Sequence, residues 1–193
     1  MAVEQPGEVV YFILDGAVKI HVEQMNGSDV ILAVLGPGET VGEMTLMDRD
    51  GRSANVVTLQ ESTLLWMAYS DFQTSLDRMP EIRDNLMHTL SGRLRRANER
   101  MQWLATQNVA GRVACQILAL ATRYGLDDSA GNVFIPLRLT QGDIGSLTGA
   151  SRERVNQVIS IYKRLGHISV DSDYRITVCN REELARCCGG PLP

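Results

Sequence analysis

Residues 139–170 read "LTQGDIGSLTGASRERVNQVISIYKRLGHISV", and this stretch decides the fold of the C-terminal half. Thr140 followed by Asp143 predicts a capping-box start to a short helix, and Gly149 separates that helix from a second one. Two short helices joined in this way are typical of a helix-turn-helix. The inward-facing side chains of the second helix are expected to be Val155, Val158, Tyr162 and Leu165.

The opposite face of the second helix carries side chains that can read DNA. These are Arg152, Glu153, Asn156, Gln157 and Ser160. Arg can donate a bidentate fork to guanine, Glu can accept from cytosine, and Asn or Gln can pair with adenine. A solvated helix face is the alternative. However, "HISV" and "YRITV" flank a turn at residues 171–173 and predict a hairpin, so the segment has the pattern of a winged helix-turn-helix.

The N-terminal part shows a different pattern, in which short apolar runs alternate with turn signals. The runs are "VVYFIL", "AVKIHV", "VILAVL", "ANVVTL" and "STLLWM", and the turns lie at Asp15-Gly16, Asn26-Gly27 and Gly36-Pro37-Gly38. Repeated strands at this spacing predict a small all-β roll or sandwich. Alternation in the second run places His21 on the polar face, where a surface residue is expected rather than a ligand.

A long helix is predicted beyond Pro80. Its apolar positions fall at intervals of four and three residues and are Leu90, Leu94, Ala97, Met101 and Leu104. This spacing is that of a coiled-coil seam, although ordinary core packing is the alternative on a lone helix. The charged flanks Arg93, Arg95, Arg96, Glu99 and Arg100 favour a dimerisation helix, with His88 on its polar face. A hinge follows at Gln107-Asn108, and a further amphipathic helix from Val109 stops at Gly125.

Composition is that of a folded protein, with 22% charged and 44% hydrophobic residues in 193. No apolar run approaches the roughly 18 residues of a membrane span, and the first residues lack the pattern of a signal peptide, so we expect a cytoplasmic protein without membrane contacts. Net charge is −6 over residues 1–109 and +2 over residues 110–193. The C-terminal part is therefore the better partner for a polyanion.

The four cysteines, Cys115, Cys179, Cys187 and Cys188, form no metal-ligand motif, and free thiols are expected in a reducing compartment. The three histidines lie in separate predicted elements. Neither a metal site nor a nucleophile–base pair is recognisable, so an enzyme is not expected.

Taken together, these segments resemble the CRP/FNR superfamily of bacterial transcription regulators over nearly the whole chain. The resemblance rests on "GE" and "RSA" within residues 42–57, "GRVACQILALA" at residues 111–121, and above all "LTQGDIGSLTGASRERV". It implies an α+β protein with an N-terminal cyclic-nucleotide-binding β-roll, a long dimerisation helix and a C-terminal winged helix-turn-helix. The corresponding boundaries are 1–79, 80–108 and 109–193.

The resemblance also implies a nucleotide site in "GEMTLMDRDGRSANVV", residues 42–57. Glu43 would accept the ribose 2′-hydroxyl proton, Arg52 would form a fork onto the cyclic phosphate, and Ser53 would add a hydroxyl. The expected ligand-binding set is Gly42, Glu43, Met44, Arg52, Ser53, Ala54 and Asn98, and the expected effector is cyclic AMP without a metal. Isolated Gly-Glu and Arg-Ser pairs are common, so this site depends on the family context.

Several positions depart from the family pattern. Ala97 and Asn98 occupy the places where cyclic AMP-responsive relatives carry polar base contacts, and Ala97 offers no hydrogen bond. Gln157 stands where the cyclic AMP receptor protein has an arginine, so a related but different operator is expected. Relatives also have residues before the position of Glu8 that contribute the first strands, which predicts a β-roll truncated at its start.

The residues expected at DNA are Thr140, Gln141, Ser151, Arg152, Glu153, Arg154 and Gln157, of which Thr140, Ser151 and Arg154 would contact the backbone. The sequence therefore predicts a homodimer that binds a palindromic operator in double-stranded DNA, responds to a cyclic nucleotide and acts through RNA polymerase. Two alternatives remain open: a ligand-independent regulator whose β-roll is a scaffold, and a nucleotide sensor that controls a protein partner.

Overall fold

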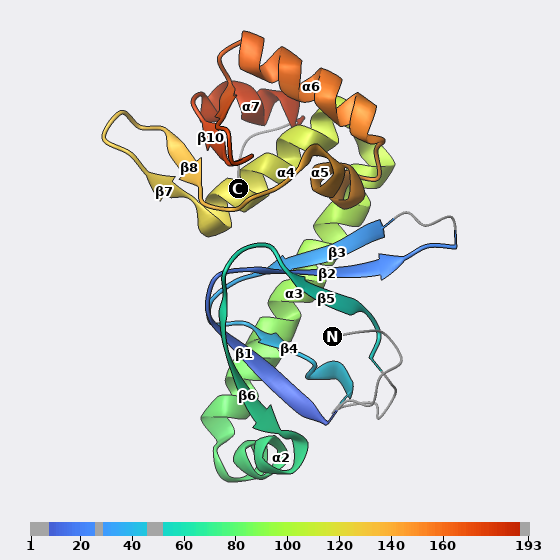
Figure 1. The fold of residues 1–193 in the computed structure, drawn as a ribbon, viewed down its shortest axis with the longest axis vertical. Coiled ribbons are helices and arrows are strands. Elements are labelled where there is room, and N and C mark those ends of the chain that lie inside the picture. The colour runs from blue at the N-terminus through green and yellow to red at the C-terminus, as the bar shows by residue number, and fades with distance from the viewer. Residues whose placement is uncertain (1–7, 26–28, 46–51, 190–193) are drawn as a thin grey trace. The chain divides into compact units, whose positions relative to one another are not determined.

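The computed structural model describes residues 8–25, 29–45 and 52–189, and the chain forms two compact units, residues 1–98 and 99–193. The strands of the first unit are β1 (Val9–Asp15), β2 (Val18–Glu23), β3 (Asp29–Leu35), β4 (Thr40–Val41), β5 (Asn55–Thr58) and β6 (Thr63–Ala68) (Figure 1). They pair antiparallel in two three-stranded sheets, with the orders β4-β1-β6 and β3-β2-β5.

Apolar side chains from both sheets form one core cluster. Ile13 and Val41 come from the first sheet, and Val18 and Leu35 come from the second. Because these four residues are buried against each other, the sheets pack face to face. The predicted β-roll is confirmed, and all five predicted strands are present.

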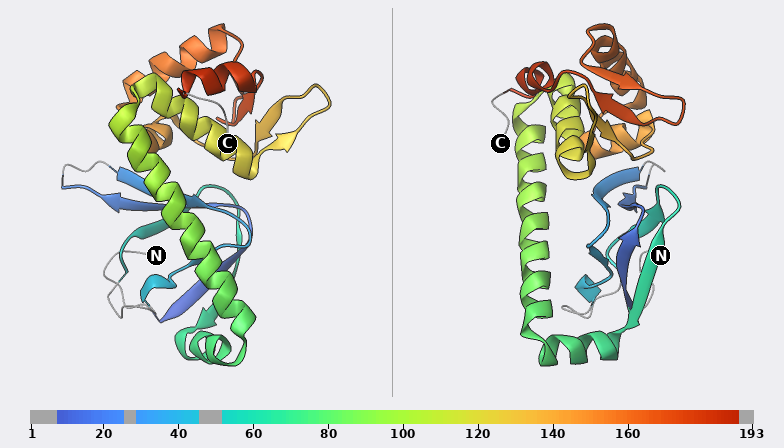
Figure 2. Two further views of the ribbon diagram at one scale, coloured as in Figure 1. Left: turned by 180° about the vertical axis from the view of Figure 1, so that it is seen from behind. Right: turned by 90° about the vertical axis from the view of Figure 1, so that its left-hand side faces the viewer.

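Two helices cover the other side of the first sheet. Val10 and Phe12 of β1 pack with Phe72 of α2 (Tyr69–Arg78) and with Leu86 of α3 (Pro80–Thr106). Pro80 occupies the first position of α3, where its missing N–H leaves no hydrogen bond unmade. The long helix predicted beyond Pro80 is therefore confirmed, and it is visible along its whole length in Figure 2.

Most of the predicted seam of α3 lies at the surface. Leu94, Met101 and Leu104 are 63%, 60% and 53% exposed, and their spacing puts all three on one face of the helix. Leu90 differs, because it packs against the core of the first unit. The stripe available for a partner thus begins at Leu94.

The second unit is built around the buried helix α4 (Val109–Tyr124), which follows the predicted hinge and has Asn108 as its N-cap. The other elements are β7 (Leu126–Asp127), β8 (Val133–Ile135), α5 (Gln141–Thr148), α6 (Arg152–Arg164), β9 (Ile168–Val170), β10 (Ile176–Val178) and α7 (Arg181–Cys187). The strands form an antiparallel sheet in the order β7-β8-β10-β9, so the predicted hairpin is confirmed as part of a larger sheet.

Local signals place the helix-turn-helix as expected. Thr140 and Asp143 form a reciprocal capping box at the start of α5, and Gly149 ends that helix with φ of 62°. Ser151 then caps α6. Val155, Val158 and Tyr162 are buried as predicted. The prediction that Leu165 faces inward is wrong, because Leu165 lies just after the last turn of α6 and is 57% exposed.

The cysteine prediction is wrong for two of the four residues. Cys115 of α4 and Cys188, which follows α7, form a disulfide with a Cα–Cα distance of 5.0 Å, whereas Cys179 and Cys187 are free. The two half-cystines are 73 residues apart, and only the packing of α7 on α4 brings them together. The expected reducing compartment was therefore a poor guide to the oxidation state of Cys115 and Cys188.

Other differences are local. His21 is mostly buried rather than at the surface, with Nδ1 3.0 Å from Oδ1 of Asp29 on the neighbouring strand β3. The strands β4, β7 and β8 and the helix α7 are too short to be recognised by periodicity. The turn predicted at Asn26-Gly27 falls outside the described residues. Within the described ranges, no helix is long and apolar enough to cross a membrane.

Candidate functional sites

A tight turn after β4 holds Arg52 in place. Gly42 has φ of 90°, and a Cβ at this position would lie 2.1 Å from Nη1 of Arg52, so only glycine fits. The guanidinium donates to the carbonyl oxygens of Gly42 (3.3 Å) and Val9 (2.9 Å). Arg52 is consequently buried in the β-roll, with a fixed orientation.

Glu43 lies beside this turn and pairs with an arginine of α3. Its carboxylate is only 2% exposed, and Oε1 accepts from Nη1 of Arg93 at 2.6 Å. Nη2 of Arg93 also donates to the carbonyl oxygen of Thr40 at 2.5 Å. The buried carboxylate is thus neutralised by a fork that also binds the backbone of β4.

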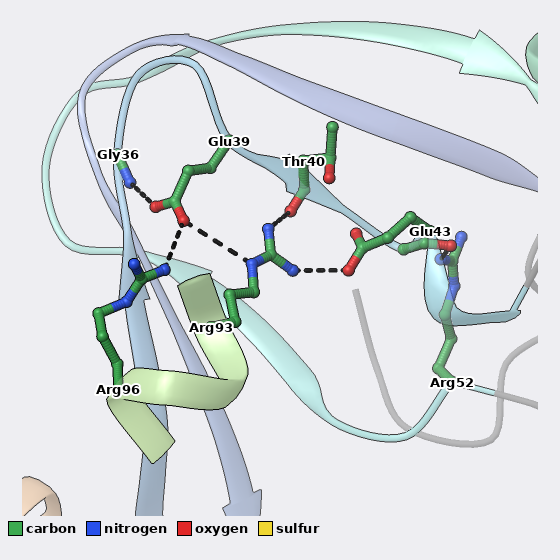
Figure 3. A network of polar contacts seen from close by, with 8 residues as sticks. Gly36, Glu39, Thr40, Glu43, Arg52, Arg93 and Arg96 are labelled. Carbon is green, nitrogen blue, oxygen red and sulfur yellow. Dashed lines mark hydrogen bonds and ion pairs between the residues drawn. The ribbon is translucent and has the colours of Figure 1, made fainter. Parts of the chain in front are cut away.

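A second carboxylate extends the network (Figure 3). Oε1 of Glu39 lies 3.7 Å from Nε of Arg93 and 3.3 Å from Nη2 of Arg96, while its Oε2 accepts from the backbone N–H of Gly36 at 3.1 Å. Arg93 and Arg96 were predicted as charged flanks of the dimer seam. Instead, both side chains turn toward the β-roll, because two buried carboxylates need cationic partners.

The second oxygen of the Glu43 carboxylate is left over in this network. Oε2 of Glu43 is buried and accepts no hydrogen bond within the described residues. Glu43, Arg52 and Arg93 line a cavity of about 70 Å³. A hydroxyl donor and an anion are the groups that a carboxylate oxygen and two guanidinium groups would bind there. The residues present therefore fit the ribose and phosphate of a cyclic nucleotide.

The other predicted ligand residues separate into two groups. Met44, Ser53 and Ala54 line the same cavity as Gly42, Glu43 and Arg52, whereas Asn98 lies exposed on α3 and is not part of its lining. Arg93 is the charged residue of the described lining that the sequence prediction missed as a site residue. Its position three residues before Arg96, on a helix that packs on the β-roll, was the available signal. Residues 46–51 fall outside the described ranges.

A larger cavity of about 330 Å³ lies elsewhere in the first unit, beside Phe12, Met67, Phe72 and Leu86. Thr40 lines this cavity, while the next residue, Val41, lines the smaller one. Among the described residues, no charged side chain lines the larger cavity, so this lining offers nothing to neutralise a phosphate. The smaller cavity is therefore the candidate nucleotide site.

In the second unit, α6 presents the predicted DNA-reading surface. Arg152, Glu153, Arg154 and Gln157 are all exposed, and no ion pair engages Arg152, Glu153 or Arg154 in the described part of the chain. Thr140 and Ser151 have structural partners, since their hydroxyl oxygens accept from the backbone N–H groups of Asp143 (3.1 Å) and Arg154 (3.3 Å). These caps orient the starts of α5 and α6.

Tyr162 fixes the rear of α6 to α4. Its hydroxyl donates to the carbonyl oxygen of Ala110 at 2.9 Å. Burial raises the pKa of Tyr162 well above its usual range, and the nearby Cys187 raises it further through charge and a hydrogen bond. The exposed face of α6 is thereby held at a fixed angle to α4.

Two protein families match the two parts of the chain. The cyclic nucleotide-binding domain family matches residues 2–79, and the Crp-like helix-turn-helix domain family matches residues 111–187. The chain is 33% identical to the "CRP-like cAMP-activated global transcriptional regulator" of Mycobacterium tuberculosis over 94% of this chain and 80% of that protein. It is also 33% identical to the "Cyclic AMP receptor protein" of Thermus thermophilus over 79% of this chain and 67% of that protein.

The chain belongs to the CRP/FNR superfamily. Its fold is similar to that of FixK2 from Bradyrhizobium japonicum, with a TM-score of 0.83 and 22% identity over 99% of this chain and 92% of that one. A CRP-family regulator from Thermus thermophilus gives a TM-score of 0.82 and 20% identity over 100% and 93% of the two chains. The α+β architecture and the winged helix-turn-helix expected from the sequence are those of this superfamily of transcription regulators.

Proposed function

We propose that this protein is a homodimeric transcription regulator whose affinity for DNA is controlled by cyclic AMP bound at Glu43 and Arg52. The observation that carries the proposal is the unpartnered, buried Oε2 of Glu43 beside the buried guanidinium of Arg52. The relatives from Mycobacterium tuberculosis and Thermus thermophilus, which are named for cyclic AMP, support this choice of nucleotide.

Arg93 provides a route from the nucleotide to the rest of the protein. It binds Glu43 and Thr40 from α3, the helix that also carries the exposed apolar stripe. A ligand that changes the Glu43–Arg93 contact would therefore change the relative free energies of different placements of α3 against the β-roll. Control of DNA binding requires that the nucleotide favour one of these positions over another.

DNA would be bound by the exposed side chains of α6 in each protomer. Arg152, Glu153 and Gln157 would read base edges, while Arg154 and the capped ends at Thr140 and Ser151 would contact phosphates. The stripe from Leu94 to Leu104 would join two protomers and set their half-sites about 34–36 Å apart. Activation would then involve contact with RNA polymerase, which transcription in vitro from a bound operator can test.

A ligand-independent regulator is the second candidate. The cavity at Glu43 is about 70 Å³, which is below the roughly 300–1,000 Å³ of typical small-molecule sites. A β-roll that serves only as a scaffold would have such a small cavity. A nucleotide would have to widen the site, and the free energy needed to widen it would reduce the affinity for the nucleotide.

Calorimetric titration of the 193-residue chain with cyclic AMP, with cyclic GMP as the comparison, tests the first candidate. Saturable binding of one cyclic AMP per subunit, accompanied by an increase in affinity for a selected DNA duplex, is the expected result. The absence of heat from a folded dimer that still binds this duplex would instead support the ligand-independent regulator.

A further inference from the structure

A hydrogen bond between two side chains crosses the helix-turn-helix. Nε2 of Gln141, the first residue of α5, donates to Oδ1 of Asn156 in the second turn of α6 at 3.0 Å. Asn156 is exposed and lies four residues after Arg152, so the two share the face of α6 that carries the DNA-reading side chains. The contact therefore lies at the candidate DNA surface.

Both ends of this contact are held by their own elements. Gln141 follows the N-cap Thr140, whose backbone N–H and hydroxyl both bond the Asp143 carboxylate, at 3.0 and 2.6 Å. Asn156 follows the fully buried Val155, which anchors α6 at this turn. Because the backbone is fixed on both sides, the hydrogen bond restricts mainly the side-chain torsions of Asn156.

The contact with Gln141 leaves one hydrogen-bond acceptor and the hydrogen-bond donor of Asn156 available. A carboxamide has an oxygen with two lone pairs and a nitrogen with two hydrogens. Gln141 occupies one lone pair of Oδ1, so one acceptor position and the Nδ2 donor remain. These are the two groups that an asparagine needs for bidentate pairing with N6 and N7 of adenine in the major groove.

We propose that Asn156 reads an adenine in each half-site and that Gln141 is its positioning residue. This inference rests on the proposed DNA-binding function. Asn156 lies on the reading face expected from the sequence, and the contact with Gln141 is what assigns it to one base and gives it a positioning residue. Orienting the amide before binding reduces the entropy lost when it meets the base. Gln141 then affects recognition of one base pair rather than overall affinity.

The alternative role for Gln141 is a direct phosphate contact, as its place at a helix start would allow. The two roles differ in their consequences. Loss of a neutral phosphate contact weakens binding to all sequences alike, whereas loss of a positioning contact removes discrimination at one base pair. A comparison across sequences therefore separates them.

The experiment begins with selection of duplexes from a random-sequence library by the wild-type 193-residue chain, with and without cyclic AMP. Affinities are then measured by fluorescence anisotropy for duplexes with each of the four bases at each half-site position. We expect one position to prefer adenine by roughly 5- to 150-fold. In both Gln141→Met and Asn156→Ala, the preference at that position should fall at least several-fold, while preferences at the other positions persist.

Gln141→Met keeps the length of the side chain and removes its amide, and thermal unfolding of each variant checks the fold. The double variant should match Asn156→Ala at the affected position, because Gln141 acts there only through Asn156. Gln157→Ala is the control, and it should alter a different position and leave the adenine preference intact.

Three outcomes would overturn the inference: a uniform loss of affinity in Gln141→Met, an unchanged preference in Asn156→Ala, or additive effects in the double variant. A wild-type protein that selects no sequence under either nucleotide condition would refute the proposed function itself. That result differs from the other three, in which the wild type binds specifically.

Discussion

The proposed role of Arg52, binding the cyclic phosphate, can be tested by a single substitution. Replacement by Ala should lower affinity for cyclic AMP by about 1.5–3 kcal/mol, or roughly 10- to 150-fold, because the cyclic phosphate loses its charged fork. Calorimetry measures the change. Arg52→Lys serves as the matched control, since it keeps the charge without the bidentate geometry, and it should recover only part of the affinity. Unchanged binding in Arg52→Ala would remove this residue from the site.

Arg93 should matter for stability as well as for binding. Arg93→Met leaves the Glu43 carboxylate buried without its cation, and we expect a loss of about 3 kcal/mol in the free energy of unfolding. Urea denaturation tests this value. Adding Glu43→Gln to Arg93→Met should restore much of the loss, because the uncompensated charge is then gone. Equal stability of the wild type and Arg93→Met would mean that the Glu43–Arg93 ion pair contributes little to the free energy of unfolding.

At the scale of elements, the disulfide joins α4 to the end of α7. It closes a loop between residues 73 positions apart, so reduction should lower the free energy of unfolding by about 2–4 kcal/mol. Thermal unfolding with and without dithiothreitol measures the effect. Cys188→Ala should already unfold at the lower temperature and should not respond to reductant. Titration of the denatured, unreduced protein should detect the free thiols of Cys179 and Cys187 only; if Cys115 and Cys188 also react, the bond is absent in solution.

The contact between α6 and α4 should depend on pH through Tyr162. The folded protein holds the phenolic proton more tightly than the unfolded chain does, because burial raises the pKa of Tyr162. This contribution to stability is complete below the unfolded pKa of about 10 and decreases as the pH rises above it. Urea unfolding between about pH 9 and pH 11 should show this decrease. Tyr162→Phe should lack this component of the decrease; an identical pH profile would exclude Tyr162 as its source.

At the scale of the whole molecule, the exposed stripe of α3 is the proposed dimer interface. Met101→Glu places a charge on a seam of apolar side chains and should convert the dimer to a monomer of 21.3 kDa. Light scattering after gel filtration measures the mass. Affinity for a two-half-site duplex should fall as well, since the half-sites would bind separately. Gln102→Glu, exposed but outside the seam, is the control; if Met101→Glu remains a dimer, the interface lies elsewhere.

Local chemistry in the sequence was sufficient to predict most of the fold. The capping pair Thr140–Asp143 and Gly149 predicted where α5 begins and ends, because each signal acts on backbone groups within a few residues. Alternation and turn residues likewise predicted five strands of the β-roll. The pairing of Gly42 and Glu43 with Arg52 came from resemblance to the family rather than from spacing.

Tertiary structure decided the features that depend on distant residues. Arg93 had the appearance of a surface charge in the sequence, but it lies 50 residues after Glu43 and becomes its partner only when α3 packs on the β-roll. Cys115 and Cys188 bond for the same reason, and Gln141 meets Asn156 only after α5 and α6 fold against each other. Hydrogen bonds, ion pairs and disulfides form over a few ångströms, so the sequence determines which groups are available and the fold determines which of them meet.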